Sequence, residues 1–258
     1  MPRVIAIANQ KGGVAKTTTA INLSASLAEA GCQVLLVDMD PQGNATSGLG
    51  IEKNRLNDCI YDVFMNGVPL AEVIQQTTQE NLQLIPARIE LAGAEIELVG
   101  QPAREYRLKE VLDLFLKESG DGFDFVFIDC PPSLGLLTLN ALTAATDVLI
   151  PVQCEYFALE GLTLLINTLE RVRENLNPQL NILGAVLTMF DARTNLSIQV
   201  VEEVKAFFRL KIFQTIIPRN VRLGEAPSHG KSVLLYDSRS RGAEVYRELA
   251  MEVLERVV

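Results

Sequence analysis

Seven short apolar runs alternate with helical patterns along this chain, and this alternation limits the possible folds more than any other feature. The runs read as continuously apolar rather than alternating, as in strands that are buried on both faces of a sheet. The runs are Val4–Ala8, Val34–Val37, Leu82–Ile85, Phe125–Ile128, Val148–Val152, Ile182–Leu187 and Ile212–Ile217. Strands that alternate with helices are joined by right-handed crossovers. The sequence therefore predicts a doubly wound α/β fold, with a mainly parallel sheet and helices on both faces.

Helical patterns fill the segments between and after these runs. They cover Thr17–Ala30, Leu91–Val99, Tyr106–Leu116, Leu136–Ala145, Leu159–Asn175, Ser197–Phe208 and Ala243–Val257. Gly31 follows the first of them, at the position where a left-handed residue ends a helix. The chain has no internal repeat and no low-complexity tract. We therefore expect one domain that spans residues 1–258.

The loop after the first predicted strand has the composition of a phosphate-binding loop. Its sequence is N-Q-K-G-G-V-A-K-T-T, residues 9–18. Ligands bind beyond the carboxyl ends of parallel strands, which is where this loop lies. Gly12 and Gly13 allow the backbone N–H groups to turn toward phosphate oxygens, and the following helix N-terminus adds partial positive charge. Lys16 is placed to reach the β- and γ-phosphates, and the Thr17 hydroxyl to bind Mg²⁺.

The loop departs from the standard pattern G-x-x-x-x-G-K-[ST]. Gln10 and Ala15 stand at its two glycine positions, and an additional lysine, Lys11, precedes the glycines. Alanine restricts the backbone if that position needs a positive φ. The purely structural alternative is a glycine-containing turn with solvated lysines. The strand before the loop and the helix after it favour the phosphate site.

Acidic residues follow two further predicted strands. The segment D-M-D-P-Q-G-N begins at Asp38, and D-C-P-P-S begins at Asp129. An acid at the end of an apolar strand holds Mg²⁺ directly or through water in many nucleotide-binding proteins. An isolated Asp more often caps a turn, but three such loops meet at one sheet edge. We therefore expect Asp40 and Asp129 to face the phosphate loop, with Mg²⁺ keeping several of its waters.

Charge is distributed unevenly along the chain. The formal net charge is −9, yet the window from Asp191 to Arg241 contains nine basic and five acidic residues. An acidic protein with one basic region is able to bind a polyanion through that region. The alternative is an ordinary solvated surface. With no tryptophan and 6% aromatic residues, a base-stacking surface for single strands is not expected.

Several other classes of protein are disfavoured by the sequence. His229 is the only histidine, so catalysis that needs two histidines is excluded. The four cysteines are far apart in sequence, which disfavours a metal site or a disulfide framework and favours a reducing cytoplasm. The sequence shows no apolar stretch long enough to cross a membrane and no signal peptide. We expect a cytoplasmic protein.

Five motifs together resemble the ParA/Soj family, the deviant Walker-A ATPases that segregate bacterial chromosomes and plasmids. They are K-G-G-V-A-K-T-T, V-D-M-D-P-Q-G-N-A-T-S-G, I-D-C-P-P-S-L-G, P-V-Q-C-E-Y-F-A-L-E-G and I-P-R-N-V-R-L-G-E-A-P-S-H-G-K. The resemblance covers essentially the whole chain. It implies a P-loop NTPase fold of the deviant Walker-A type. Ala15 is a departure, because members commonly have glycine there.

The resemblance also implies an ATP- and Mg²⁺-dependent switch with weak basal ATPase activity. ATP-bound monomers would pair face to face, with Lys11 of each reaching the partner's phosphates. Asp40 matches the acid that orients the attacking water, and Asp129 matches the acid linked to Mg²⁺. The implied nucleotide-binding residues are Lys11, Gly12, Gly13, Val14, Ala15, Lys16, Thr17 and Thr18, with Pro218, Arg219 and Asn220 framing the adenine. The implied metal-binding residues are Thr17, Asp40 and Asp129.

Members of the family bind double-stranded DNA without sequence preference as the ATP dimer, and a ParB-type protein stimulates hydrolysis. The resemblance therefore implies a homodimer on the nucleoid and no membrane partner. Arg193 and Arg222 match DNA-binding positions, and Lys205 and Arg209 extend the patch because they lie one helical turn apart. The alternative is that the two matched arginines pair with nearby acids such as Asp191 and Glu225.

Other functions are possible on this fold. A MinD-like membrane-associated positioning ATPase needs a basic amphipathic C-terminal helix, whereas residues 242–258 carry four glutamates and two arginines. A nitrogenase-iron-protein-like reductase needs paired cluster-ligating cysteines, which the sequence does not show. A metabolic phosphotransferase or amide ligase would need a pocket for an acceptor substrate, and no motif indicates one.

Overall fold

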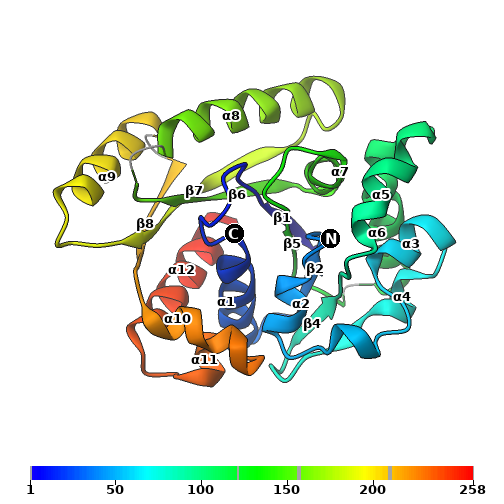
Figure 1. The fold of residues 1–258 in the computed structure, drawn as a ribbon, viewed down its shortest axis with the longest axis horizontal. Helices are drawn as coiled ribbons and strands as arrows, with labels where there is room; N and C mark the ends of the chain where they lie inside the picture. Colours follow the sequence, from blue (N-terminus) through cyan, green and yellow to red (C-terminus); the bar gives the residue numbers. More distant parts are fainter. Residues whose placement is uncertain (1, 121, 156–157, 209–210, 258) are drawn as a thin grey trace.

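The computed structural model describes residues 2–120, 122–155, 158–208 and 211–257. Eight strands of this part of the chain form one sheet, in the order β3-β4-β2-β5-β1-β6-β7-β8 (Figure 1). Their bounds are β1 (Arg3–Ile7), β2 (Val34–Asp38), β3 (Gln75–Gln76), β4 (Leu82–Ile85), β5 (Phe125–Asp129), β6 (Asp147–Gln153), β7 (Asn181–Phe190) and β8 (Ile212–Pro218). Every pairing is parallel except that of β3 with β4. The predicted fold class is confirmed.

All seven predicted strands are present, with bounds within a few residues of those expected. The strand that sequence reasoning missed is β3, a pair of glutamines at the sheet edge. The missed strand has no apolar run because an edge strand of two residues contributes little to the core. Strands β2 and β5, by contrast, are buried at every residue.

The helices divide between the two faces of the sheet, each with its own hydrophobic core. One face carries α3 (Ile60–Asn66), α4 (Leu70–Val73), α5 (Leu91–Glu97), α6 (Arg107–Glu118), α7 (Leu136–Ala144), α8 (Ala158–Asn175) and α9 (Asn195–Phe208). The other carries α1 (Lys16–Glu29), α2 (Asn44–Gly48), α10 (Val221–Glu225), α11 (Val233–Tyr236) and α12 (Arg241–Val257). In Figure 1 the sheet runs between α8 and α9 above and α1 and α12 below.

The short helices α2, α3, α4, α10 and α11 were not expected from the sequence. Each has at most seven residues, which is too few for a helical period to be distinguished from a loop. The predicted helix stop at Gly31 is confirmed, because its φ is +95°.

Strand β1 lies between β5 and β6, at the point where the direction of strand order reverses. In doubly wound sheets the loops diverge at such a point and leave a crevice at the carboxyl ends of the strands. The loop between β1 and α1 therefore lies where this fold places its ligand.

Candidate functional site

The loop between β1 and α1 is curled by two left-handed residues, Gly13 at φ +74° and Ala15 at φ +67°. Position 15 thus does require a positive φ. An alanine in this left-handed conformation costs about 1 kcal/mol of conformational free energy, because of its methyl group. Side chains from neighbouring strand ends hold the loop. Asn9 accepts a hydrogen bond from the Lys11 N–H (3.0 Å) and donates to the Pro151 carbonyl (2.7 Å). The Thr188 hydroxyl donates to the Val14 carbonyl (3.1 Å).

Lys16 is the first residue of α1 and lies inside the loop, with 6% of its surface exposed. Its ammonium group donates to the carbonyl of Lys11 (3.1 Å). Burial lowers the pKa of Lys16, while the negative charge of Asp129 opposes the shift. The ammonium group therefore lacks full compensation from the protein, and an anion at the loop would provide it.

Asp38 and Asp129 end the adjacent strands β2 and β5, and they are paired in register. Asp38 is fully buried and accepts hydrogen bonds from the Thr46 N–H (2.8 Å), the Thr46 hydroxyl (2.7 Å) and the Asp40 N–H (3.1 Å). Even so, burial raises the pKa of Asp38 to about 6. Thr46 also accepts a hydrogen bond from the Ala87 N–H (3.0 Å), so its hydroxyl joins the loops that follow β2 and β4.

Asp129 is fully buried, and neither of its carboxylate oxygens has a hydrogen-bond partner among the described residues. Burial and the nearby charge of Asp38 raise the pKa of Asp129 well above its usual range, although Thr17 and Lys16 lie close enough to lower it in part. Buried carboxylate oxygens without partners call for a cation or ordered water. Magnesium fits this arrangement, because it keeps most of its waters and needs few protein oxygens.

No cluster of three or more His, Cys, Asp or Glu side chains with metal-binding geometry occurs in the described part of the chain. A magnesium ion here would therefore be bound by the Thr17 hydroxyl, by Asp129 directly or through water, and by the phosphates of a ligand. Its coordination sphere would not be made of protein ligands alone.

Asp40 lies two residues beyond β2 and is almost fully buried. Its Oδ1 accepts the N–H of Gln42 (2.9 Å), which forms a turn in the loop that leads to α2. Asp40 contributes to the electrostatic environment of both Lys16 and Asp129. The predicted convergence of the three post-strand loops is thus observed. The roles of Asp40 and Asp129 in hydrolysis stay predictions.

A cavity of about 160 Å³ lies beside the end of the phosphate loop. It is lined by Ala15 and Thr18 on one side and by Pro218, Arg219 and Asn220 on the other. The structure therefore brings the predicted adenine segment next to the predicted phosphate segment. Tyr246 of α12 also lines this cavity, and its hydroxyl lies 3.2 Å from the Thr19 hydroxyl.

Lys11 points toward Glu155, in the loop after β6, with 3.7 Å between the ammonium nitrogen and a carboxylate oxygen. The other oxygen of Glu155 lies 3.6 Å from the Arg219 guanidinium and accepts a hydrogen bond from Gln153 (2.6 Å). About a third of the Lys11 side chain is exposed. Unlike Lys16, Lys11 lies at the surface, where a second molecule is able to reach it.

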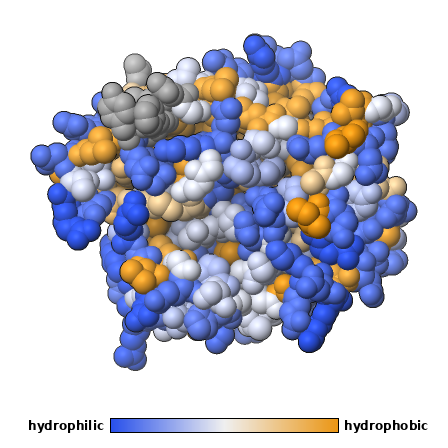
Figure 2. Space-filling model, in the orientation of Figure 1, coloured by the Kyte–Doolittle hydropathy of each residue, from blue (hydrophilic) through white to orange (hydrophobic). Residues whose placement is uncertain are grey.

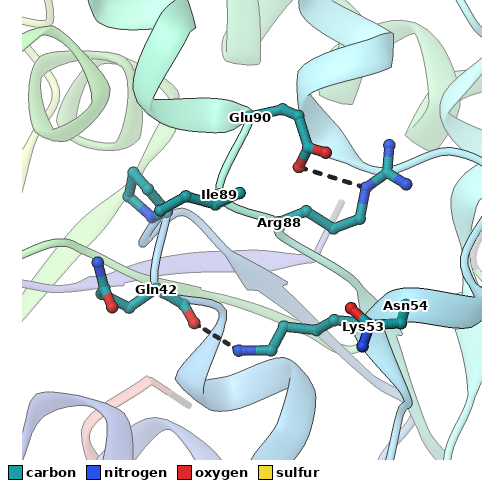
Figure 3. Close-up of a pocket in the computed structure, with 7 residues that line it drawn as sticks. Gln42, Lys53, Asn54, Arg88, Ile89 and Glu90 are labelled. Carbon is teal, nitrogen blue, oxygen red and sulfur yellow. Dashed lines mark hydrogen bonds and ion pairs between the residues drawn. The ribbon is translucent and has the colours of Figure 1, made fainter.

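A larger hollow of about 480 Å³ lies on the other side of the Asp40 loop (Figure 3). It is lined by Pro41, Gln42, Lys53, Asn54, Arg88, Ile89 and Glu90. Lys53 donates to the Gln42 carbonyl (2.7 Å), and Arg88 pairs with Glu90 (3.7 Å). Its cations are engaged with the protein, and none of the residues that line it belongs to the phosphate loop, so the smaller cavity beside Ala15 is the better candidate for a nucleotide base.

The basic residues predicted to bind DNA lie near the β8 edge of the sheet, on the loop before α9, on α9 and on α10. Arg193 is bound to Asp191 by two hydrogen bonds (2.6 and 2.9 Å), and Arg222 pairs with Glu225 (2.8 Å) and Asp237 (3.2 Å). Lys205 lies 3.7 Å from Glu202. Arg209 lies outside the described residues. The alternative left open by the sequence, pairing with Asp191 and Glu225, is therefore what the structure shows.

Sequence reasoning missed Asp38, Thr46, Thr188 and Tyr246 as parts of this region. Only Asp38 carried a usable signal, since it is the first acid after an apolar strand. Thr46 lies in the segment that begins at Asp38 but is not an acid, and Thr188 and Tyr246 come from distant segments that only the fold brings near the loop.

Comparison with known proteins gives consistent matches. Residues 2–182 match a family profile described as "AAA domain". "Sporulation initiation inhibitor protein Soj" of Bacillus subtilis (strain 168) is 62% identical over 98% of this chain and 98% of that protein. "Chromosome partitioning protein ParA" of Myxococcus xanthus is 54% identical over 98% of this chain and 88% of that protein. This chain belongs to the ParA/Soj family of chromosome-partitioning ATPases.

Solved structures confirm the P-loop NTPase fold of this ParA/Soj family member. A crystal structure titled cobyrinic acid a,c-diamide synthase from Mycobacterium smegmatis, with bound ADP and magnesium, has a TM-score of 0.86 and 42% identity. It covers 100% of this chain and 96% of that one. The septum site-determining protein MinD of Pyrococcus horikoshii, complexed with Mg-ADP, has a TM-score of 0.81 and 28% identity, covering 98% of this chain and 96% of that one. No helix in the described part of this ParA/Soj family member has the length and apolar character to cross a membrane.

Proposed function

We propose that this protein is an ATP-driven switch for chromosome or plasmid segregation. With ATP and Mg²⁺ it pairs as a homodimer, binds double-stranded DNA without sequence preference, and hydrolyses ATP when a ParB-type protein stimulates it. It would therefore act in the cytoplasm, on the nucleoid. The observation that carries this proposal is the buried pair of Lys16 and Asp129, whose charges act on one another while both Asp129 oxygens lack a hydrogen-bond partner among the described residues.

ATP hydrolysis at this site needs positioning and charge stabilisation more than covalent chemistry. The N–H groups of residues 12–18 and the Lys16 ammonium would hold the phosphates. Bound Mg²⁺ neutralises charge that develops on the β- and γ-phosphate oxygens. Thr17 and Asp129 would hold that ion, directly or through its waters. Asp40 would orient the attacking water, because it lies at the same edge on a loop able to move with the γ-phosphate.

Lys11 is the residue that would link hydrolysis to pairing. Its partial exposure and its position ahead of the glycines suit a charge supplied to the partner's phosphates. Glu155 competes for Lys11 within the protomer, so a phosphate group must replace that ion pair when the dimer forms. This exchange makes pairing depend on the nucleotide.

The membrane-associated alternative is not supported by the structure of α12. Its apolar residues Val245, Leu249 and Val253 are buried in the core shared with α1 and β8, so they are not available to lipid. The amide-ligase alternative finds support in one similar protein, the Mycobacterium smegmatis structure described as a cobyrinic acid a,c-diamide synthase. The curated relatives that are 51–62% identical carry partitioning or Soj names instead.

The test is molecular sizing and duplex DNA binding, measured in parallel with ATP, ADP and no nucleotide. We expect dimers and DNA binding with ATP only. Lys11→Ala should keep ATP binding and lose the dimer, whereas Lys109→Ala, an exposed lysine on α6, should match the parent. Binding of DNA without nucleotide, or a normal dimer and normal turnover in Lys11→Ala, would contradict the switch. Binding to vesicles of anionic lipid would favour the membrane alternative.

A further inference from the structure

Four arginines near the β8 edge of the sheet share one property: each is paired with a carboxylate of its own chain. Arg193 pairs with Asp191, and Arg222 with Glu225 and Asp237. Arg219 pairs with Glu155, and Arg241 with Glu244 and Glu248. We call Arg193, Arg219, Arg222 and Arg241 the paired arginines.

Three of the paired arginines surround one hollow. It has a volume of about 650 Å³ and is lined by Arg193, Arg219 and Arg241, together with Asp191 and Val221. Figure 2 shows mostly hydrophilic residues, interrupted by isolated hydrophobic ones, along the left margin of this face, where Figure 1 places α9 and α10. The hollow thus contains three guanidinium groups, which is the charge needed to bind a polyanion. Each of these groups is already paired with a carboxylate of the protein.

We propose that Asp191, Glu225 and Asp237 are internal competitors of DNA phosphate, which hold Arg193 and Arg222 in the free protein and lose them to phosphate when DNA binds. This inference rests on the proposed DNA-binding function and adds its regulation. The acids lower the affinity of one protomer, so that stable binding needs the two linked surfaces of a dimer.

The competition follows from the geometry of the guanidinium group. A carboxylate and a phosphate both accept two parallel N–H bonds from arginine, so the two anions exclude one another at the same fork. Asp191 already makes this two-bond contact with Arg193. Its Oδ1 also accepts the backbone N–H of Arg193 (3.0 Å), which fixes the carboxylate beside the fork.

Exposure decides which partner moves. The Arg193 side chain is 86% exposed, whereas that of Asp191 is 21% exposed. The hydrogen bonds from Arg193 hold the pKa of Asp191 well below its usual range, so the competing charge is present at any physiological pH. The mobile guanidinium is therefore the partner that exchanges a fixed carboxylate for an incoming phosphate.

An ordinary surface ion pair would behave differently. Exposed pairs contribute little to stability and open readily, and removal of one acid then only makes the net charge less negative. A matched control separates the two cases. Asp113 of α6 pairs with Lys109 at 2.9 Å, is exposed, and lies far along the chain from the paired arginines. Asp113→Asn makes the same change in net charge as Asp191→Asn.

The experiment measures duplex DNA binding in ATP across a range of salt concentrations. Asp191→Asn keeps an oxygen for the Arg193 N–H but loses the charge. An exposed pair changes an equilibrium by about fivefold at most and a dimer carries two copies, so we expect binding tighter by about three- to twentyfold. The plot of log affinity against log salt should keep its slope, because Arg193 contacts the same phosphates in the parent and in the variant. Glu225→Gln should act in the same direction through Arg222.

Arg193→Ala provides a second, independent check. In that background Asp191→Asn should act no more strongly than Asp113→Asn, because the fork for which it competes is gone. If the parent binds DNA in ATP and Asp191→Asn matches Asp113→Asn in affinity, the competition is overturned while the switch stands. If the parent does not bind DNA in ATP, the proposed function fails and the competition fails with it.

Discussion

The phosphate loop and the paired arginines both place cations beside acids, but with opposite results. Lys16 is 6% exposed, and its neighbour Asp129 has two buried oxygens without hydrogen bonds among the described residues. Arg193 is 86% exposed and makes two short hydrogen bonds to Asp191. The buried charges of Lys16 and Asp129 are therefore left to be compensated by a ligand, whereas the exposed Arg193 is already compensated by Asp191.

The contrast explains why one chain can bind two kinds of phosphate in different ways. Charges taken out of water are costly unless they are fully paired, so a buried site binds its anion tightly and is little affected by salt. Exposed charges are screened by salt and exchange partners easily. Nucleotide binding should therefore tolerate salt, and DNA binding should not.

The largest effect expected is that of Lys16→Ala, which removes the cation at the centre of the buried site. ATP affinity should fall by at least about 100-fold, because a charge-assisted contact to phosphate is lost where water cannot replace it. Stability to unfolding without nucleotide should not fall, since burial disfavours the charged form of Lys16. Calorimetric titration with Mg-ATP and thermal unfolding measure the two quantities. Unchanged ATP affinity would show that the buried site is not the nucleotide site.

Asp40→Ala should reduce ATP turnover by about 100-fold while ATP binding persists, since a residue that orients water acts on the rate of hydrolysis. The variant should accumulate as a DNA-bound dimer in ATP. A coupled ATPase assay with the ParB-type partner, beside filter binding of ATP, separates the two steps. Turnover close to that of the parent would move the assignment from Asp40 to Asp129.

On the exposed side, Arg222→Ala or Arg193→Ala should weaken duplex DNA binding by about tenfold for every sequence and flatten the salt slope by about two units across a dimer. ATP binding should be unaffected. Arg55→Ala is the matched control, because Arg55 is also exposed and paired with a carboxylate, that of Glu52 (2.8 Å). An unchanged salt slope in the double variant of Arg193 and Arg222 would place the DNA surface elsewhere.

A pH dependence of stability separates the two regions by its sign. Burial raises the pKa of Asp38 to about 6, so the folded state binds its proton more tightly than the unfolded chain does. The stability contributed by protonated Asp38 is therefore present below pH 4 and is lost as the pH rises to about 6. Relative to Asp38→Asn, the parent should lose at most about 3 kcal/mol over that range.

Urea unfolding of the parent and of Asp38→Asn between pH 4 and pH 7 measures this difference. Asp191 has the opposite sign, because its pKa is lowered in the folded state and its contribution is lost as the pH falls. Parallel stability curves for the parent and Asp38→Asn would show that the buried carboxyl is ionised throughout.

The sequence predicted the arrangement of the strands and the meeting of three loops because both depend on patterns local in sequence. A continuous apolar run predicts a strand buried on both faces, and parallel strands place their following loops at one edge. The burial of Asp38 was not predictable in this way. It depends on the register of β2 against β5 and on hydrogen bonds from Thr46, eight residues away.

The pairing of Arg193 with Asp191 and of Arg222 with Glu225 was open to prediction, because partners two or three residues apart are often within reach. The pairing of Glu155 with both Lys11 and Arg219 was not, since it joins three loops that only the folded sheet brings together. Sequence patterns thus identify the residues of this site more readily than they identify the competition among them.

The hydroxyl of Thr46 connects the loop that follows β2 with the loop that follows β4. It donates to Asp38 at the phosphate edge and accepts the N–H of Ala87, whose neighbour Arg88 donates to the Leu56 carbonyl (2.9 Å). Three hydrogen bonds thus connect Asp38 with the segment ahead of α3, through Thr46 and the backbone of residues 87–88. Replacing Thr46 with valine would remove both hydrogen bonds of the hydroxyl while its backbone N–H could still bind Asp38, so the segment that carries α3 to α6 would lose one of its links to the nucleotide edge.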